Sequence, residues 1–208
     1  MAFWVSSDLH IAHLNALTIM SFRPWPDVDS MNEGLIANHN SVVKPEDTII
    51  WLGDLIMGKK FENVPKYLPR LNGRKLIILG NHDYLPSEIK KPEKLKQYQE
   101  LYFSNGINTI YDGWIRLSEI TNDPKHVNIK LCHFPSATTE DDREIEYEQR
   151  YKHLRPIVND NEVLWHGHTH SQSVVSSRNS FHVGVDAWDY KPVSLELLLK
   201  MTEVALIK

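Results

Sequence analysis

The sequence lacks the features that mark several classes of protein. Its 208 residues include one cysteine, Cys132, which excludes an internal disulfide and a cysteine-based zinc cluster. The apolar, strand-like run before Cys132 indicates a buried thiol rather than a nucleophile. No apolar run approaches the roughly 18 residues that a membrane span needs, and the N-terminal residues lack the basic segment of a secretory signal. We therefore expect a cytoplasmic protein with no membrane partner.

The sequence also has no large excess of charge of either sign. The formal net charge is −4, which gives no basic surface for bulk nucleic acid. We expect no stable nucleic-acid partner, although a substrate the size of a nucleotide stays open. Hydrophobic residues make up 41% and charged residues 24% of the chain, as in ordinary globular proteins. Because no repeat or linker stands out, we predict one domain over residues 1–208.

Short β-branched runs recur along the chain and alternate with helical patterns. Apolar runs of this kind are typical of strands buried on both faces, so we predict strands at 3–7, 48–52, 76–79, 127–132, 162–165 and 181–185. Helical patterns predict helices at 30–42, 64–71, 94–103 and 143–158, the first opened by a capping box from Ser30 to Glu33. The charged stretch 138–150 is typical of a solvated helix face. This alternation indicates a layered α/β domain.

The chain has eleven histidines, and several of them fall in short polar clusters that follow predicted strands. Side chains two residues apart on a strand share a face, which would let each Asp-x-His or His-x-His pair converge on one ion. Neighbouring glycines let the backbone turn sharply there. A single such cluster is weak evidence, but five in order, each at a strand end, indicate a functional site. The five clusters are Asp8-Leu9-His10, Gly53-Asp54, Gly80-Asn81-His82-Asp83, His133 and Gly167-His168-Thr169-His170.

Imidazole and carboxylate groups together suit transition metals. Mn, Fe, Zn, Co and Ni accept such mixed donors, whereas Ca and Mg prefer oxygen ligands. Two such ions about 3.5–4 Å apart can clamp a phosphoryl group and generate hydroxide near neutral pH. A bridging carboxylate has to hold them that close, and Asp54 is the candidate. We expect two divalent transition metal ions, with Mn²⁺ favoured.

The ordered clusters resemble those of the calcineurin-like metallophosphoesterase superfamily, and the likeness extends from Asp8 to His170. The resemblance implies an α/β fold in which a two-sheet β-sandwich is flanked by helices, giving four layers. His82 resembles the catalytic histidine that donates to the phosphate and can protonate the leaving group. The resemblance also implies one metal held by Asp8, His10, Asp54 and His170, and a second held by Asp54, Asn81, His133 and His168.

Three further segments are similar to a compact, single-domain group of bacterial and phage phosphoesterases, some of which open 2′,3′-cyclic nucleotides. They are residues 40–54, Arg23-Pro24 and Val183-Gly184-Val185-Asp186. This likeness implies a metal-dependent phosphodiesterase that hydrolyses a nucleotide-sized diester by attack of a metal-bridging hydroxide. A phosphomonoesterase, a nuclease and a non-catalytic scaffold on the same fold remain alternatives.

The sequence departs from two branches of the superfamily. Gly53-Asp54 continues into Leu55-Ile56-Met57-Gly58, whereas Ser/Thr protein phosphatases continue with an Asp and an Arg-Gly pair. The absent Asp leaves His82 without its usual orienting partner. Purple acid phosphatases carry a tyrosine soon after Gly-Asp, and none follows here.

Two further residues are candidates for substrate binding beside Asn81 and His82. His13 follows His10 closely enough to reach the phosphate, although a loop histidine without function is an equal alternative. Arg23 could clamp a phosphate through its planar guanidinium, with a surface arginine as the alternative. Lesser candidates, for base stacking, the site rim and support of the metal ligands, are Tyr84, Trp188 and His166 in that order.

Overall fold

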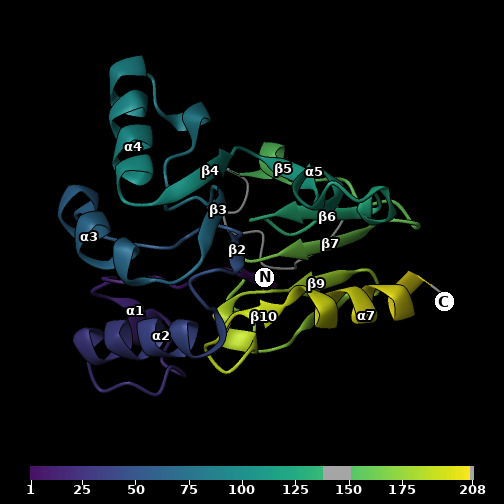
Figure 1. Cartoon of the computed structure of the whole chain (residues 1–208), viewed down its shortest axis with the longest axis horizontal. Helices are drawn as coiled ribbons and strands as arrows, with labels where there is room; N and C mark the ends of the chain where they lie inside the picture. The colour runs from purple at the N-terminus through teal and green to yellow at the C-terminus, as the bar shows by residue number, and fades with distance from the viewer. Residues whose placement is uncertain (138–150, 207–208) are drawn as a thin grey trace.

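The computed structural model describes residues 1–137 and 151–206, and its strands form two five-stranded sheets (Figure 1). The first sheet has the order β10-β1-β2-β3-β4, with β1 (Phe3–Ser6), β2 (Thr48–Trp51), β3 (Arg74–Ile78), β4 (Ile107–Tyr111) and β10 (Val193–Ser194). The second has the order β5-β6-β7-β9-β8, with β5 (Trp114–Arg116), β6 (Ile129–Cys132), β7 (Val163–His166), β8 (Val175–Ser177) and β9 (Ser180–His182). Both sheets are mixed, because β10, β5 and β8 run antiparallel to their neighbours at the sheet edges.

Helices flank the two sheets. In Figure 1 the early helices lie to the left, beside the first sheet, and α5 and α7 lie to the right. The α-helices are α1 (Ala16–Ile19), α2 (Val28–Val42), α3 (Lys60–Tyr67), α4 (Pro92–Ser104), α5 (Leu117–Thr121) and α7 (Leu195–Leu206). Short 3₁₀ helices are η1 (Leu68–Arg70), η2 (Pro86–Glu88), η3 (Pro124–His126), η4 (Lys152–Leu154) and η5 (Val185–Ala187). None of the helices in the described part of the chain combines the length and apolar character that crossing a bilayer requires.

The two faces of the first sheet are buried in two different cores. Trp51 and Ile77 point to one face and pack with residues of α2, α3 and α4 such as Leu35. Side chains on the other face, Ile50 among them, pack with the second sheet around Trp165. Burial on both faces explains the apolar character of β2 and of residues 76–78 in β3, which begins with the charged Arg74 and Lys75.

The α/β fold with two sheets flanked by helices is confirmed. Each of the six predicted strands is present, with ends within three residues of the predicted ones. The predicted start of α2 was wrong: Asp27, in an extended conformation, is the N-cap, and its carboxylate accepts a hydrogen bond from the Ser30 amide, so the helix begins before Ser30. Of the predicted helix 143–158, the described part contains only η4 as a helical segment. The charged stretch 138–150 lies outside the described residues.

A buried hydrogen bond joins the second sheet to α7 and gives a test of the packing. The indole Nε1 of Trp165 donates to Thr202 Oγ1 at 3.1 Å, and both side chains are buried. Thr202→Val keeps the shape but leaves the indole N–H without an acceptor, which we expect to lower the free energy of unfolding by about 1–3 kcal/mol. Urea unfolding measures this. The same substitution in a Trp165→Phe background should cost clearly less, and an equal cost would contradict the hydrogen bond.

Candidate metal centre

The loops that follow β1 and β2 are held together by backbone hydrogen bonds. β1 and β2 are parallel, so their carboxyl ends meet at one edge of the sheet. The pairing continues past the strands, because the Asp8 amide donates to the Gly53 carbonyl at 3.1 Å and the His10 amide donates to the Asp54 carbonyl at 3.0 Å. The predicted ligands of two clusters therefore lie side by side.

Five of the seven predicted ligands have left-handed backbone conformations. The φ angles are 59° at Asp8, 52° at His10, 56° at Asp54, 71° at His168 and 49° at His170. These residues lie beyond the ends of β1, β2 and β7, so strand alternation, which the sequence pattern had indicated, is not what brings them together. A non-glycine residue in this region costs of order 1–3 kcal/mol, and such residues cluster at functional sites.

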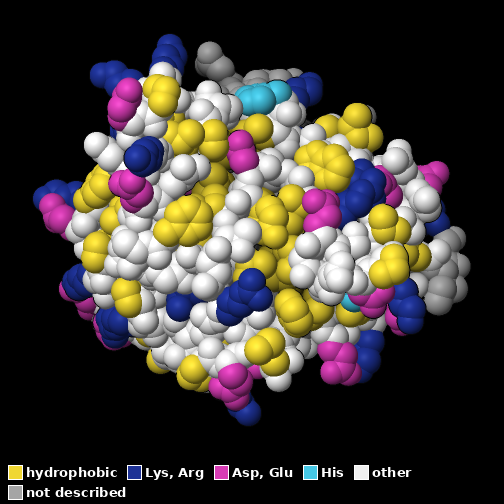
Figure 2. Space-filling view, turned by 45° about the horizontal axis from the view of Figure 1, so that its top comes forward, with side chains coloured by type: hydrophobic (Ala, Val, Ile, Leu, Met, Phe, Trp, Pro, Cys, Tyr) yellow, Lys and Arg dark blue, Asp and Glu magenta, His cyan; other side chains and the backbone are white. Residues whose placement is uncertain are grey.

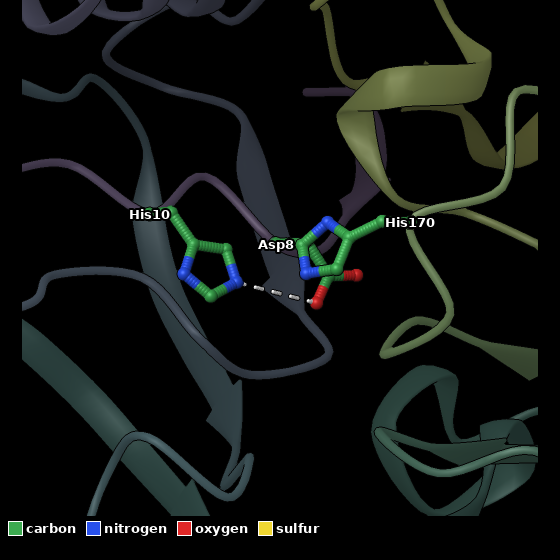
Figure 3. Close-up of side chains that lie close together, drawn as sticks. All are labelled: Asp8, His10 and His170. Atoms are coloured by element: carbon green, nitrogen blue, oxygen red, sulfur yellow. Dashed lines mark ion pairs between the residues drawn. The ribbon is translucent and has the colours of Figure 1, made fainter. Parts of the chain in front are cut away.

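A first ligand group, formed by Asp8, His10, Asp54 and His170, comes together where these loops meet. Figure 3 shows Asp8, His10 and His170 pointing toward one another. Ligand atoms of these three side chains lie within 4.8 Å of one another. The Nε2 atom of His10 is 3.9 Å from Asp8 Oδ1 and 3.6 Å from Asp54 Oδ2. Spacings of this size leave room for one ion between the atoms.

A second ligand group consists of Asp54, Asn81, His133 and His168. The Oδ1 atom of Asn81 lies 2.8 Å from His133 Nε2 and 2.9 Å from His168 Nδ1. Those two ring nitrogens are 3.3 Å apart, and His133 Nε2 is 3.5 Å from Asp54 Oδ2. The two groups thus meet at one oxygen, Asp54 Oδ2. An oxygen in this position could reach an ion in either group.

The hydrogen-bonding pattern at His133 fits a cation. Its Nδ1 lies 2.7 Å from the Leu52 carbonyl, which can only accept, so Nδ1 carries the proton. Burial lowers the pKa of His133 to about 4, and the neutral ring therefore has a lone pair on Nε2. This lone pair faces the Asn81 oxygen, which is itself an acceptor. Two acceptors that face each other at 2.8 Å are stabilised by a positive ion between them.

His10 fits a cation for a related reason. Its ring is buried, and neither ring nitrogen has a hydrogen-bond partner among the residues that the structure describes. Burial lowers the pKa of His10 well below its usual value, so the ring is neutral and available as a ligand. Burial also raises the pKa of Asp8, and it raises the pKa of Asp54 to about 6, with the Asp83 charge adding to the effect. A bound cation would offset the cost of both buried carboxylates.

Asp54 is fixed by its neighbours on the Gly80-Asn81-His82-Asp83 turn. The His82 amide donates to Asp54 Oδ1 at 2.8 Å, which leaves Oδ2 directed at the two ligand groups. Asp83 Oδ2 accepts from the amides of Asp54 and Gly80 at 2.8 and 2.9 Å, and the Tyr102 hydroxyl donates to its other oxygen. A Cβ atom at Gly80 would collide with Asp54 Oδ1, so only glycine lets the turn come this close.

Comparison with known proteins agrees with this geometry. A family model described as calcineurin-like phosphoesterase matches residues 1–172. The chain belongs to the calcineurin-like phosphoesterase family. The Gene 66 protein of Mycobacterium phage L5 is 31% identical over 192 residues, covering 89% of this chain and 86% of its own. The uncharacterized protein MJ1445 of Methanocaldococcus jannaschii is 28% identical over 207 residues, covering 96% and 90%.

A solved structure is similar over nearly the whole length of both chains. It is the protein of unknown function AQ665 from Aquifex aeolicus, with a TM-score of 0.65, 25% sequence identity and coverage of 96% of this chain and 98% of that one. The described part of this calcineurin-like phosphoesterase therefore has the fold that its sequence resemblance implied.

Of the four residues predicted to bind substrate, three line one cavity and Arg23 does not. His13, Asn81 and His82 line a cavity of about 350 Å³ above the ligand groups, and Ile19 and Met20 form an apolar wall. The His10 ring centroid is 5.3 Å from that of His13 and 5.5 Å from that of His82.

Arg23 departs from the expectation that it clamps a phosphate. Its side chain is fully buried and pairs with Asp186, and it is not part of the cavity lining. Tyr84 also departs from its expected role, since it is buried against Tyr98 and Tyr102 rather than exposed for stacking on a base.

Sequence reasoning assigned no role to two carboxylates that support the ligands. Asp186 accepts from His170 Nδ1 at 2.9 Å, and Asp83 accepts the two amides already described. Both residues lie in motifs named in the sequence analysis. Asp186 is 16 residues from His170 and Asp83 is 29 residues from Asp54, so no local sequence pattern indicated these contacts. His166 contacts the Gly167 carbonyl and Ser176 Oγ, so it supports the turn that carries His168.

Metal binding should stabilise this protein, because the ligand atoms converge only in the folded state. We expect Mn²⁺ at about 100 times its dissociation constant to add roughly 2.7 kcal/mol to the free energy of unfolding for each ion bound. In Asp54→Asn the gain should be much smaller, because the shared oxygen is lost. Thermal unfolding with and without Mn²⁺ measures this, and elemental analysis should find close to two ions per chain. Absence of bound metal in the wild type would favour a scaffold over an enzyme.

Proposed function

We propose that this calcineurin-like phosphoesterase is a dinuclear phosphodiesterase that hydrolyses a nucleotide-sized phosphodiester. The observation that carries the proposal is the position of Asp54 Oδ2, 3.6 Å from His10 Nε2 and 3.5 Å from His133 Nε2, between the two ligand groups. When bound, two divalent ions supply Lewis acidity toward the phosphoryl group and make a hydroxide nucleophile available near neutral pH. Mn²⁺ is the ion that we propose first.

The residues of the cavity have separable roles in this proposal. The backbone amide of His82 donates to Asp54, and its side chain lines the cavity. There the ring donates a hydrogen bond to a phosphate oxygen or to the leaving group. Burial lowers the pKa of His82 while the Asp54 charge acts against this, so the neutral ring, with one N–H to donate, is the main form at pH 7. The ring centroid of His13 lies 6.3 Å from that of His82, and His13 contributes a second N–H donor.

Beyond the two proposed ions, the cavity lining in the described part of the chain supplies no fixed positive side chain for the second negative charge of a monoester. Among the described residues that line it there is no lysine or arginine, and the histidines are the available donors. A phosphate monoester carries close to two negative charges near neutral pH and gains most from fixed cations. A diester carries one. The apolar wall of Ile19 and Met20 suits the sugar or base of a nucleotide.

The surface charge supports a small substrate rather than polymeric nucleic acid. On the face drawn in Figure 2, acidic and basic side chains of the described residues are interspersed and form no continuous basic stripe. The net charge of the whole chain is −4. A protein that tracks a nucleic-acid backbone needs a positive groove.

We expect the Mn²⁺-loaded protein to hydrolyse bis-p-nitrophenyl phosphate with a higher kcat/KM than p-nitrophenyl phosphate. His82→Ala should lower kcat by about 10²- to 10³-fold, as expected when a positioned hydrogen-bond donor to developing charge is lost. Asp54→Asn should lose activity together with metal. Steady-state kinetics at saturating Mn²⁺ measure each value.

His153→Ala is the matched control, since His153 is exposed on η4 and outside the cavity. It should retain wild-type rates. Full activity in either Asp54→Asn or His82→Ala would contradict the assigned roles, and a strong preference for the monoester would replace the diesterase by a phosphomonoesterase.

Assays with nucleotides test which kind of phosphodiester the protein hydrolyses. Among them we expect 2′,3′-cyclic nucleotides to be opened fastest, ahead of 3′,5′-cyclic nucleotides and linear dinucleotides. Chromatography of the products over time measures the order. Degradation of a long single strand at physiological salt, at a rate above that for the small diesters, would support the nuclease alternative.

A further inference from the structure

Arg23 is a buried cation whose contacts all lie within the protein. Its Nε donates to Asp186 Oδ1 at 2.8 Å and its Nη2 donates to Asp186 Oδ2 at 3.2 Å, which gives the two-point contact that a guanidinium makes with a carboxylate. Both side chains of the pair are fully buried. Arg23 follows α1 and Asp186 lies in η5, so the pair joins segments 163 residues apart.

The same guanidinium also holds the loop that carries two metal ligands. Its Nη2 donates to the Asp8 carbonyl at 2.8 Å, and its Nη1 donates to the Leu9 carbonyl at 2.9 Å. Asp8 and His10, which flank Leu9, are in the left-handed region. A planar cation with donors on several edges can fix two successive carbonyls and a carboxylate at once, whereas an ammonium group cannot.

Asp186 also contacts a third candidate ligand, His170. Its Oδ2 accepts from His170 Nδ1 at 2.9 Å, so that nitrogen bears a proton and a metal would bind at Nε2 once the second ring proton has left. The contact also fixes the rotation of the ring. A carboxylate behind a ligand histidine makes the ring a better donor, and losing such a partner weakens metal affinity by about 10- to 100-fold.

We propose that Arg23 and Asp186 are positioning residues that preform the first ligand group and set its metal affinity separately from that of the second. The proposal rests on the metal centre of the proposed function. Arg23 and Asp186 contact Asp8, Leu9 and His170, all in or beside the first group.

The second ligand group has its own support. His133 Nδ1 is fixed by the Leu52 carbonyl, and Asn81 lies on the turn that Asp83 secures. These contacts are made by residues other than Arg23 and Asp186. The affinity of the second group should therefore survive changes at the buried pair.

The test uses the full chain and Mn²⁺ alone as the probe. Titration followed by the electron paramagnetic resonance signal of free Mn²⁺ resolves the number of sites and their affinities, and the low-temperature spectrum reports whether two bound ions are coupled. We expect the wild type to bind two coupled ions. Asp186→Asn and Arg23→Lys should each weaken one site by about 10- to 100-fold and leave the other within about 2-fold. At limiting Mn²⁺ the coupled spectrum should give way to that of an isolated ion.

Glu33→Gln is the matched control, because Glu33 makes a similar two-point pair with Arg70 on the surface. It should bind Mn²⁺ as the wild type does. A single substitution at Arg23 or Asp186 leaves a buried group without its partner, so the double variant Arg23→Gln with Asp186→Asn is measured as well; it removes both charges together and should show the same selective weakening.

Three results would overturn the proposal. Two sites of unchanged affinity in every folded variant would show that the pair has no positioning role. Equal weakening of both sites would show a general structural defect. Absence of Mn²⁺ binding by the wild type would remove the proposed function itself, and so is distinct from a failure of the positioning role alone.

Discussion

The buried carboxylate of Asp54 is the constraint on which the candidate site depends. One of its oxygens accepts the His82 amide, and the other lies between the two ligand groups. Burial and the charge of Asp83 raise its pKa to about 6, so keeping it ionised without a cation opposes folding as the pH rises through that value. The position of Asp54 is nevertheless fixed, because Asp83 accepts a hydrogen bond from the Asp54 amide. Asp83 is itself held by the Gly80 amide and the Tyr102 hydroxyl. A bound cation would offset the cost of ionising Asp54.

The candidate ligand residues stand out in the sequence, but the geometry that brings them together does not. The Asp, His and Asn residues of the five clusters are brought together in the structure, since parallel buried strands deliver their carboxyl ends to one edge. The convergence, however, comes from left-handed backbone at Asp8, His10, Asp54, His168 and His170 rather than from strand alternation. Such conformations are stabilised by tertiary contacts, such as those between the Arg23 guanidinium and two loop carbonyls. Contacts between residues so far apart in the chain leave no local pattern.

The same limit explains which elements of the fold were predictable. β1, β2, β3, β6, β7 and β9 are apolar runs ended by polar clusters, and these were predicted. β4, β5, β8 and β10 were not, and they include the edge strands of both sheets, where exposure weakens the apolar pattern. The start of α2 was misplaced because two capping residues compete at Asp27 and Ser30, and only the extended backbone at Asp27 decides between them. Arg23 was expected to clamp a phosphate, with a surface arginine as the alternative, because its partner Asp186 lies 163 residues away in the chain and leaves no local signal.

The ligands come from both sheets, and this links the site to the packing of the whole molecule. Asp8, His10, Asp54 and Asn81 follow strands of the first sheet, whereas His133, His168 and His170 follow strands of the second. The loops approach so closely that a Cβ atom at Gly167 would collide with the side chains of Ser7 and Asp8. The His168 amide donates to both oxygens of Asp8, at 3.1 and 2.9 Å, across this junction. A cation in either ligand group would therefore connect the two sheets as well as bind substrate, so that metal affinity and the relative position of the sheets are one coupled property.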